Sequence, residues 1–167
     1  MTRHDQVAEF TAMVNARWPA LVRAVMLLGG SRADAEDVVQ TTLTRCFEKW
    51  ERVRRAESPD AYVHRMLVNS WIDRGRRRSS GELLLADPDS GRAADVDHAV
   101  RLDIERALGT LSAEQRLVVV LRYYLDLSER QAADVLGVPP GTVKSRLARG
   151  LAALATVLAT EERGERS

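Results

Sequence analysis

Apolar residues recur every three to four positions along most of the 167-residue chain, and no alternating run of the strand type has any length. This spacing predicts an all-α protein. The repeat is interrupted where glycine, proline and small polar residues gather. We expect helices over residues 5–28, 31–50, 58–78 and 99–108, one that begins at 112, two short ones within 127–150 and a last one that ends near 160, with a loop over 51–57.

The second of these helices has a clear start and a clear buried side. Ser31 is a candidate N-cap, and Asp34 stands three residues later, in the capping-box position. Carboxylates in this first turn also oppose the helix dipole favourably. An apolar stripe follows, spaced to face a core, and its members are Ala35, Val38, Val39, Leu43, Cys46, Phe47 and Trp50.

Residues 79–98 break the helical pattern and predict a flexible linker. The stretch holds five carboxylates against one arginine, and Pro88 and Gly91 disfavour a helix. The chain is therefore expected to form two small helical domains, joined by this acidic linker and followed by a disordered tail. The predicted boundaries are 1–78, 79–98, 99–160 and 161–167.

Residues 127–150 predict two short helices joined by a tight turn. Ser128 and Gln131 have capping-box spacing, Gly137 suits a left-handed helix end, and Pro139-Pro140 suits a new helix start. Polar and basic residues follow, as in a helix-turn-helix that enters the major groove. An ordinary αα-hairpin with a solvated basic face is the alternative. The residues predicted to lie on the outer face are Thr142, Lys144, Ser145, Arg146 and Arg149.

A second basic surface is predicted at the C-terminal end of the helix over residues 58–78. Four arginines stand within five residues there, namely Arg74, Arg76, Arg77 and Arg78. Their mutual repulsion favours a polyanionic partner such as a phosphate backbone, although arginines at a helix C-terminus also complement its dipole. Asn69 and aromatic residues on the same helix suit unpaired bases, while core packing is the alternative for the aromatic ones.

Composition narrows the classes of function. A net charge of +1 predicts no bulk affinity for nucleic acid, so only the distribution of charge can support it. Cys46 is the single cysteine and the three histidines are scattered, so we expect no disulfide, no metal site and no cofactor. The start lacks an apolar leader and no segment is long enough to span a bilayer, which predicts a cytoplasmic protein with no membrane contact.

Three segments carry recognisable strings. They are DAEDVVQ at residues 34–40, AYVHRMLVNSWIDRGRRR at 61–78, and the stretch 127–150, in which GTVKSRL is the most specific part. These strings resemble regions 2.2, 2.3–2.4 and 4.2 of the extracytoplasmic-function (ECF) sigma factors, which are promoter-specificity subunits of bacterial RNA polymerase. The resemblance covers nearly the whole chain, and the composition is similar to that of an actinobacterial SigE-type subgroup.

The resemblance implies roles for the first domain. It implies binding to core RNA polymerase, with Asp37, Gln40 and Thr41 on the coiled coil of the β′ subunit. It also implies that one set of residues faces the −10 element of promoter DNA: Arg65, Asn69, Arg74, Arg76 and Arg77. In the family the loop before that helix captures a flipped −10 base, and here residues 51–57 are rich in arginine and contain no aromatic residue.

The second domain is implied to contact the −35 element and the β flap of the polymerase. Thr142, Lys144, Ser145, Arg146 and Arg149 are the implied −35 contacts. Pro139-Pro140 departs from the serine cap that is more usual in the family. The acidic linker is implied to pass through the polymerase cleft, and an anti-sigma factor is a further candidate partner. No catalytic role is implied.

Two other classes of function stay open on the sequence alone. A DNA-binding regulator that does not join polymerase would use the same helix-turn-helix, but it would leave the first domain unexplained and would normally dimerise. An enzyme could use Asp34, Glu36 and Asp37 to hold a divalent metal, although two or three carboxylates on one helix make a poor site.

Overall fold

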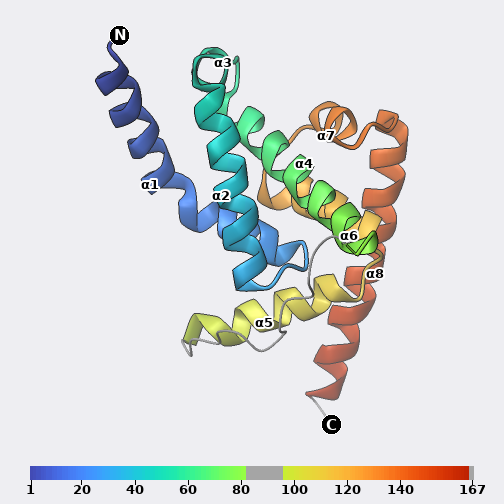
Figure 1. The fold of residues 1–167 in the computed structure, drawn as a ribbon. Helices are drawn as coiled ribbons and strands as arrows, with labels where there is room; N and C mark the ends of the chain where they lie inside the picture. The colour runs from blue at the N-terminus through green and yellow to red at the C-terminus, as the bar shows by residue number, and fades with distance from the viewer. Residues whose placement is uncertain (82–95, 166–167) are drawn as a thin grey trace. The chain divides into compact units, whose positions relative to one another are not determined.

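The computed structural model describes residues 1–81 and 96–165, and the side chains from residue 103 onward in the second stretch (Figure 1). All regular structure in these ranges is helical, which confirms the all-α prediction. The chain divides into two compact units. The first holds α1 (Arg3–Leu27), α2 (Arg32–Glu48), α3 (Trp50–Arg55) and α4 (Pro59–Ser79), and the second α5 (Val96–Gly109), α6 (Ala113–Val119), η1 (Val120–Tyr124), α7 (Glu129–Leu136) and α8 (Pro140–Gly164).

In the first unit the core forms where α2 packs against α4. Val39 of α2 and Leu67 and Val68 of α4 are fully buried. Cys46 is buried as predicted and its Sγ lies 3.6 Å from Sδ of Met66, while burial raises the pKa of its thiol to about 11. The cysteine is therefore an inert core residue.

The predicted start of α2 is confirmed, whereas the predicted burial of one residue in its apolar stripe is not. The Asp34 amide donates to Oγ of Ser31 at 3.1 Å, and the Ser31 amide donates to Oδ2 of Asp34 at 3.2 Å, which completes the capping box. Phe47 was predicted to be buried, but it is 43% exposed. It lies at the edge of the stripe, where its ring meets that of Phe10 at 5.0 Å between centroids.

The predicted loop over 51–57 is wrong for most of its length, because α3 occupies Trp50–Arg55. Glu51 forms ion pairs with Arg54 at 3.0 Å and with Arg55 at 3.1 Å, one helical turn away. Buried Val53 anchors the same turn in the core. Local charge pairing and one apolar anchor together favour a short helix over a loop.

In the second unit the predicted helix-turn-helix is present. Ser128 and Gln131 form a capping box, and Gly137 ends α7 with φ of +64°, in the left-handed region. Pro139 is the N-cap of α8 and Pro140 its first residue, as the sequence predicted. A Cβ on buried Gly150 would lie 3.0 Å from Cγ2 of Val119, so this glycine allows α8 to lie close against α6.

Two boundaries in this unit differ from those predicted, and one element was not predicted. The segment predicted as linker falls mostly on residues 82–95, outside the described residues, and its end from Val96 belongs to α5. A separate last helix was predicted to end near residue 160, but α8 is one continuous helix from Pro140 to Gly164, which Glu161, Glu162 and Arg163 extend as good helix formers. A π-helical turn at Val120–Tyr124 gave no signal in the sequence.

Candidate nucleic-acid interface

The N-terminal part of α8 presents most of the residues that were predicted to contact the −35 element. Val143 is fully buried and fixes the helix against the unit's core. Lys144, Ser145 and Arg149 are exposed, and Thr142 is partly exposed. These four side chains are therefore accessible to a partner at the start of a helix whose rotation is set by Val143.

The structure corrects the fifth residue of that set. Arg146 was predicted on the outer face, yet its side chain is only 24% exposed and its Nη2 lies 3.4 Å from Oε1 of Glu114, next to the N-terminus of α6. Residues three apart share a side of a helix, so Arg146 lies on the flank of Val143. That spacing could have indicated from the sequence that Arg146 faces its own unit.

Helix α4 carries a row of exposed polar residues. Arg65, Asn69 and Arg76 are spaced four and seven residues apart, so they share one face, and all three are exposed. Arg77 is exposed one position further along. The described structure thus brings together four of the five residues predicted to face the −10 element.

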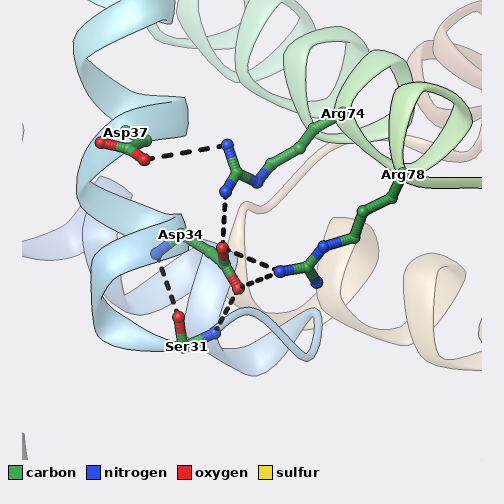
Figure 2. Close-up of polar contacts among 5 residues, drawn as sticks. All are labelled: Ser31, Asp34, Asp37, Arg74 and Arg78. Atoms are coloured by element: carbon green, nitrogen blue, oxygen red, sulfur yellow. Dashed lines mark hydrogen bonds and ion pairs between the residues drawn. The ribbon is translucent and has the colours of Figure 1, made fainter. Parts of the chain in front are cut away.

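The fifth, Arg74, is held inside the unit by a buried carboxylate (Figure 2). Its Nη2 donates to Oδ1 of Asp34 at 2.6 Å, and Nη2 of Arg78 lies 3.2 Å from the same oxygen. The Asp34 side chain is 4% exposed. Burial alone would raise the pKa of this carboxyl, but hydrogen bonds from Arg74 and Ser31 outweigh it and lower the pKa. Two of the clustered arginines thus have an internal counter-charge, so repulsion within the cluster does not by itself require a polyanionic partner.

A polar groove of about 320 Å³ runs between α2 and α4. It places residues predicted for the polymerase contact beside residues predicted for the −10 strand. Arg74 was predicted for the −10 strand and Asp37 for the polymerase contact. The two residues are neighbours, because Nη1 of Arg74 lies 3.8 Å from Oδ2 of the exposed Asp37. The lining residues are Asp37, Val38, Thr41, Arg45, Ser70, Asp73, Arg74, Arg76 and Arg77.

Two of the charged lining residues, Arg45 and Asp73, were not predicted from the sequence. Nη1 of Arg45 donates to Oγ of Ser70 at 3.2 Å and lies 3.6 Å from Oδ2 of Asp73. Arg45 follows Asp37 and Thr41 at intervals of four residues, so the three share a face of α2. This four-residue spacing could have indicated from the sequence that Arg45 lies beside the other two.

The other side of the exposed face of α2 borders an apolar groove of about 430 Å³ against α1. Gln40 lines this groove, and Asp37 and Thr41 line the polar one. The three residues predicted for the polymerase contact therefore occupy the surface of α2 between two hollows. The residues that line the apolar groove are Phe10, Val14, Trp18, Gln40, Leu43, Thr44 and Phe47.

The described residues do not support the metal-enzyme alternative. Asp34 binds arginines, Glu36 pairs with Arg32 at 3.1 Å, and no group of three or more histidine, cysteine or carboxylate side chains is placed to hold a metal ion in the described parts of the chain. None of the described helices combines the length and the apolar character needed to cross a membrane.

Comparison with known proteins adds the family. Sequence models of Sigma-70 region 2 and of Sigma-70 region 4 match residues 13–81 and 101–154. The RNA polymerase sigma-E factor of Streptomyces avermitilis is 35% identical over 90% of this chain and 86% of its own length. The ECF RNA polymerase sigma factor SigL of Mycobacterium tuberculosis is 34% identical over 92% of this chain and 90% of its own length.

A solved structure agrees with these relatives. The sigma factor RpoE of Bartonella quintana, in a co-crystal with the anti-sigma factor NepR, superposes with a TM-score of 0.70 at 26% identity, over 90% of this chain and 97% of that one. Both the sequence models and this superposition cover the two helical units in order. The chain belongs to the ECF sigma factors, the subunits that bind core RNA polymerase and direct it to promoters.

Proposed function

We propose that this sigma factor uses three separate surfaces to bind core RNA polymerase, the −10 element and the −35 element. The exposed face of α2 docks on core RNA polymerase, the exposed row of α4 holds the −10 strand, and the start of α8 reads the −35 duplex. The observation that carries the proposal is the groove between α2 and α4, because its lining joins Asp37 and Thr41 to Arg76 and Arg77. A promoter strand that lies along α4 therefore passes close to the surface that polymerase covers.

The polymerase contact is assigned to Asp37, Gln40 and Thr41. All three are exposed, while their neighbours Val38 and Val39 are buried, so substitution of the three should leave the core intact. The apolar groove beside Gln40 adds area for a partner helix from the β′ coiled coil, since a helix lays its apolar side into such a hollow. The second unit is assigned to the β flap.

The −10 contact is assigned to Arg65, Asn69, Arg76 and Arg77, with a changed role for Arg74. Arginines supply affinity through phosphates, and an amide such as that of Asn69 suits the edge of an unpaired base. Arg74 is already bonded to Asp34, so we assign it to the positioning of α4 on α2.

The −35 contact is assigned to Thr142, Lys144, Ser145 and Arg149. Their position in the first turns of α8 matches the way a recognition helix presents its N-terminal residues to base edges. Arg146 is assigned to the fixing of α8 on α6, through Glu114.

Three further assignments follow from the family. The first unit, with α1 to α4, forms the polymerase and −10 domain, and the second unit, with α5 to α8, forms the −35 domain. An anti-sigma factor is a partner of this chain as NepR is of RpoE. The chain carries no catalytic centre of its own and acts in the cytoplasm, where the polymerase transcribes.

Run-off transcription with purified core RNA polymerase on a genomic fragment library tests the proposal. We expect initiation from a small set of templates that share −10 and −35 elements. A variant that changes Asp37, Gln40 and Thr41 to alanine should fail to co-purify with the core enzyme, whereas an Asp60→Asn control should co-purify normally. Absence of initiation from every template, or binding to duplex DNA without binding to polymerase, would favour a regulator that acts alone.

A further inference from the structure

We propose that the groove between α2 and α4 is a binding site for a backbone phosphate of the promoter strand, with Arg45 as a ligand that sequence reasoning did not identify and Asp73 as its internal competitor. The proposal deepens the proposed function, on which it rests for the identity of the nucleic acid. It assigns residues of α2, and not only of α4, to the contact with DNA.

The lining of the groove has the composition of an anion site. It carries four arginines against two carboxylates, so positive charge is in excess. Its volume of about 320 Å³ is roughly ten times the ~30 Å³ that one water takes in the liquid, which leaves room for a phosphate group and its hydration. Arginine also suits phosphate, because its planar fork can donate two parallel hydrogen bonds.

The contacts of these arginines fall into two kinds. Arg74 is anchored to buried Asp34 by a hydrogen bond of 2.6 Å. By contrast, Arg45 lies 3.6 Å from Asp73 and Arg74 lies 3.8 Å from Asp37, and both carboxylates are about half exposed or more. Charge-assisted hydrogen bonds usually measure about 2.7–2.9 Å, so the second kind of pair is loose.

A loose, solvated ion pair contributes little and exchanges readily. A phosphate that enters the groove can therefore replace Asp73 as the partner of Arg45 at a small cost in free energy. The hydrogen bond of 3.2 Å from Arg45 to Oγ of Ser70 stays in place. Until a phosphate enters, Asp73 cancels part of the positive charge of the groove. We expect this competition to lower the affinity of the protein for single strands.

Binding of a short fluorescent single-stranded DNA to the full-length chain tests the proposal, with fluorescence anisotropy over a series of salt concentrations. Asp73→Asn should tighten binding about two- to fivefold, the scale set by a partly exposed ion pair. Arg45→Ala should weaken binding and reduce the slope of log K against log salt by about 0.7, the value for one phosphate contact on a single strand. The gain from Asp73→Asn should vanish in the Arg45→Ala background.

Asp60→Asn is the matched control. Asp60 is also on α4 and also pairs with an arginine, Arg17, but it lies at the other end of the helix and outside the groove. Both substitutions remove one negative charge. An equal gain from Asp60→Asn, or a gain from Asp73→Asn that survives in Arg45→Ala, would show a long-range charge effect and overturn the proposal.

Two further arms separate the sources of phosphate and the causes of failure. Displacement of the DNA by inorganic phosphate at fixed ionic strength would show a site for a free anion and would overturn the assignment to a strand. Run-off transcription with the same variants is read separately. If promoter-directed transcription is normal and Asp73→Asn and Asp60→Asn have equal effects on DNA binding, only this inference is overturned. If the unsubstituted protein supports no transcription, the proposed function is overturned.

Discussion

Nη2 of Arg74 lies 2.6 Å from Oδ1 of Asp34 and so joins the C-terminal part of α4 to the first turn of α2, across 40 residues of sequence. Asp34 is 4% exposed in its side chain and also closes the capping box with Ser31. One carboxylate therefore caps the start of a helix, pairs with two arginines and fixes the two helices on which the polymerase and −10 contacts are proposed to lie.

Removal of this carboxylate should be costly. Asp34→Ala leaves Arg74 and Arg78 without their shared counter-charge, and loss of one partner of a buried pair typically costs about 3–5 kcal/mol. Asp60→Ala, which removes the exposed partner of Arg17, should cost no more than about 1 kcal/mol. Urea unfolding followed by circular dichroism measures both free energies. Similar losses in the two variants would show that Asp34 does not act as a buried anchor.

The same carboxylate predicts a dependence of stability on pH. The pKa of Asp34 is lowered in the folded protein, so its contribution to the free energy of unfolding is complete above its ordinary value of 3.8 and is lost as the pH falls through the lowered folded value. The difference in stability between the unsubstituted chain and Asp34→Asn should therefore be constant near neutral pH and shrink below pH 3.8. A difference that grew on acidification would contradict the direction of the pKa shift.

The lone cysteine gives an independent check of the first unit's core. Burial raises the pKa of Cys46 from 9.0 to about 11, so at a given pH below 9 the thiolate is about 100-fold rarer than in an ordinary thiol. An alkylating reagent should react with the native chain at least that much more slowly than with the urea-unfolded chain. Rapid labelling of the native protein would show that the α2–α4 core opens readily.

The elements that could be predicted from the sequence are those set by local chemistry. Ser31 with Asp34 and Ser128 with Gln131 both form the capping boxes that their spacing predicts. Gly137 likewise adopts the left-handed conformation that its place after α7 predicts. Each of these features depends on atoms within one turn of helix, so a single sequence contains the information.

The features that could not be predicted depend on contacts between distant residues. Nothing near Asp34 indicates that its partners are Arg74 and Arg78, and nothing near Arg146 in the sequence names Glu114. Exposure along a single helix follows from helical spacing, and Lys144, Ser145 and Arg149 are exposed as that spacing predicts. Arg146 was predicted to face outward and Arg74 to face the −10 strand, yet each side chain turns towards a carboxylate on a neighbouring helix, whose position the local sequence does not give.

A phosphate contact and a base contact should differ in their effect across promoters. Arg77 is exposed at the end of α4 and is assigned to phosphate. Arg77→Ala should weaken open-complex formation similarly at all promoters and reduce the salt slope by about one unit. Filter binding of the holoenzyme to several promoters over a range of salt measures both. An effect confined to promoters with one −10 sequence would instead assign Arg77 to base readout.

Lys144 and Arg146 lie two residues apart on α8, but their substitutions should differ in effect. The loss from Lys144→Ala should depend on the −35 sequence, and the loss from Arg146→Ala should not. Exposed Lys144 is proposed to reach base edges, so Lys144→Ala should cost about 1–3 kcal/mol at particular −35 bases and little at others. Arg146 is 24% exposed and pairs with Glu114, so Arg146→Ala should shift the angle of α8 and weaken all −35 sequences alike. Glu114→Gln should reproduce the uniform loss of Arg146→Ala in a milder form, since Arg146 keeps its packing. Binding to a library of −35 variants measures each pattern, and a base-specific loss in Arg146→Ala with no effect of Glu114→Gln would return Arg146 to the reading surface.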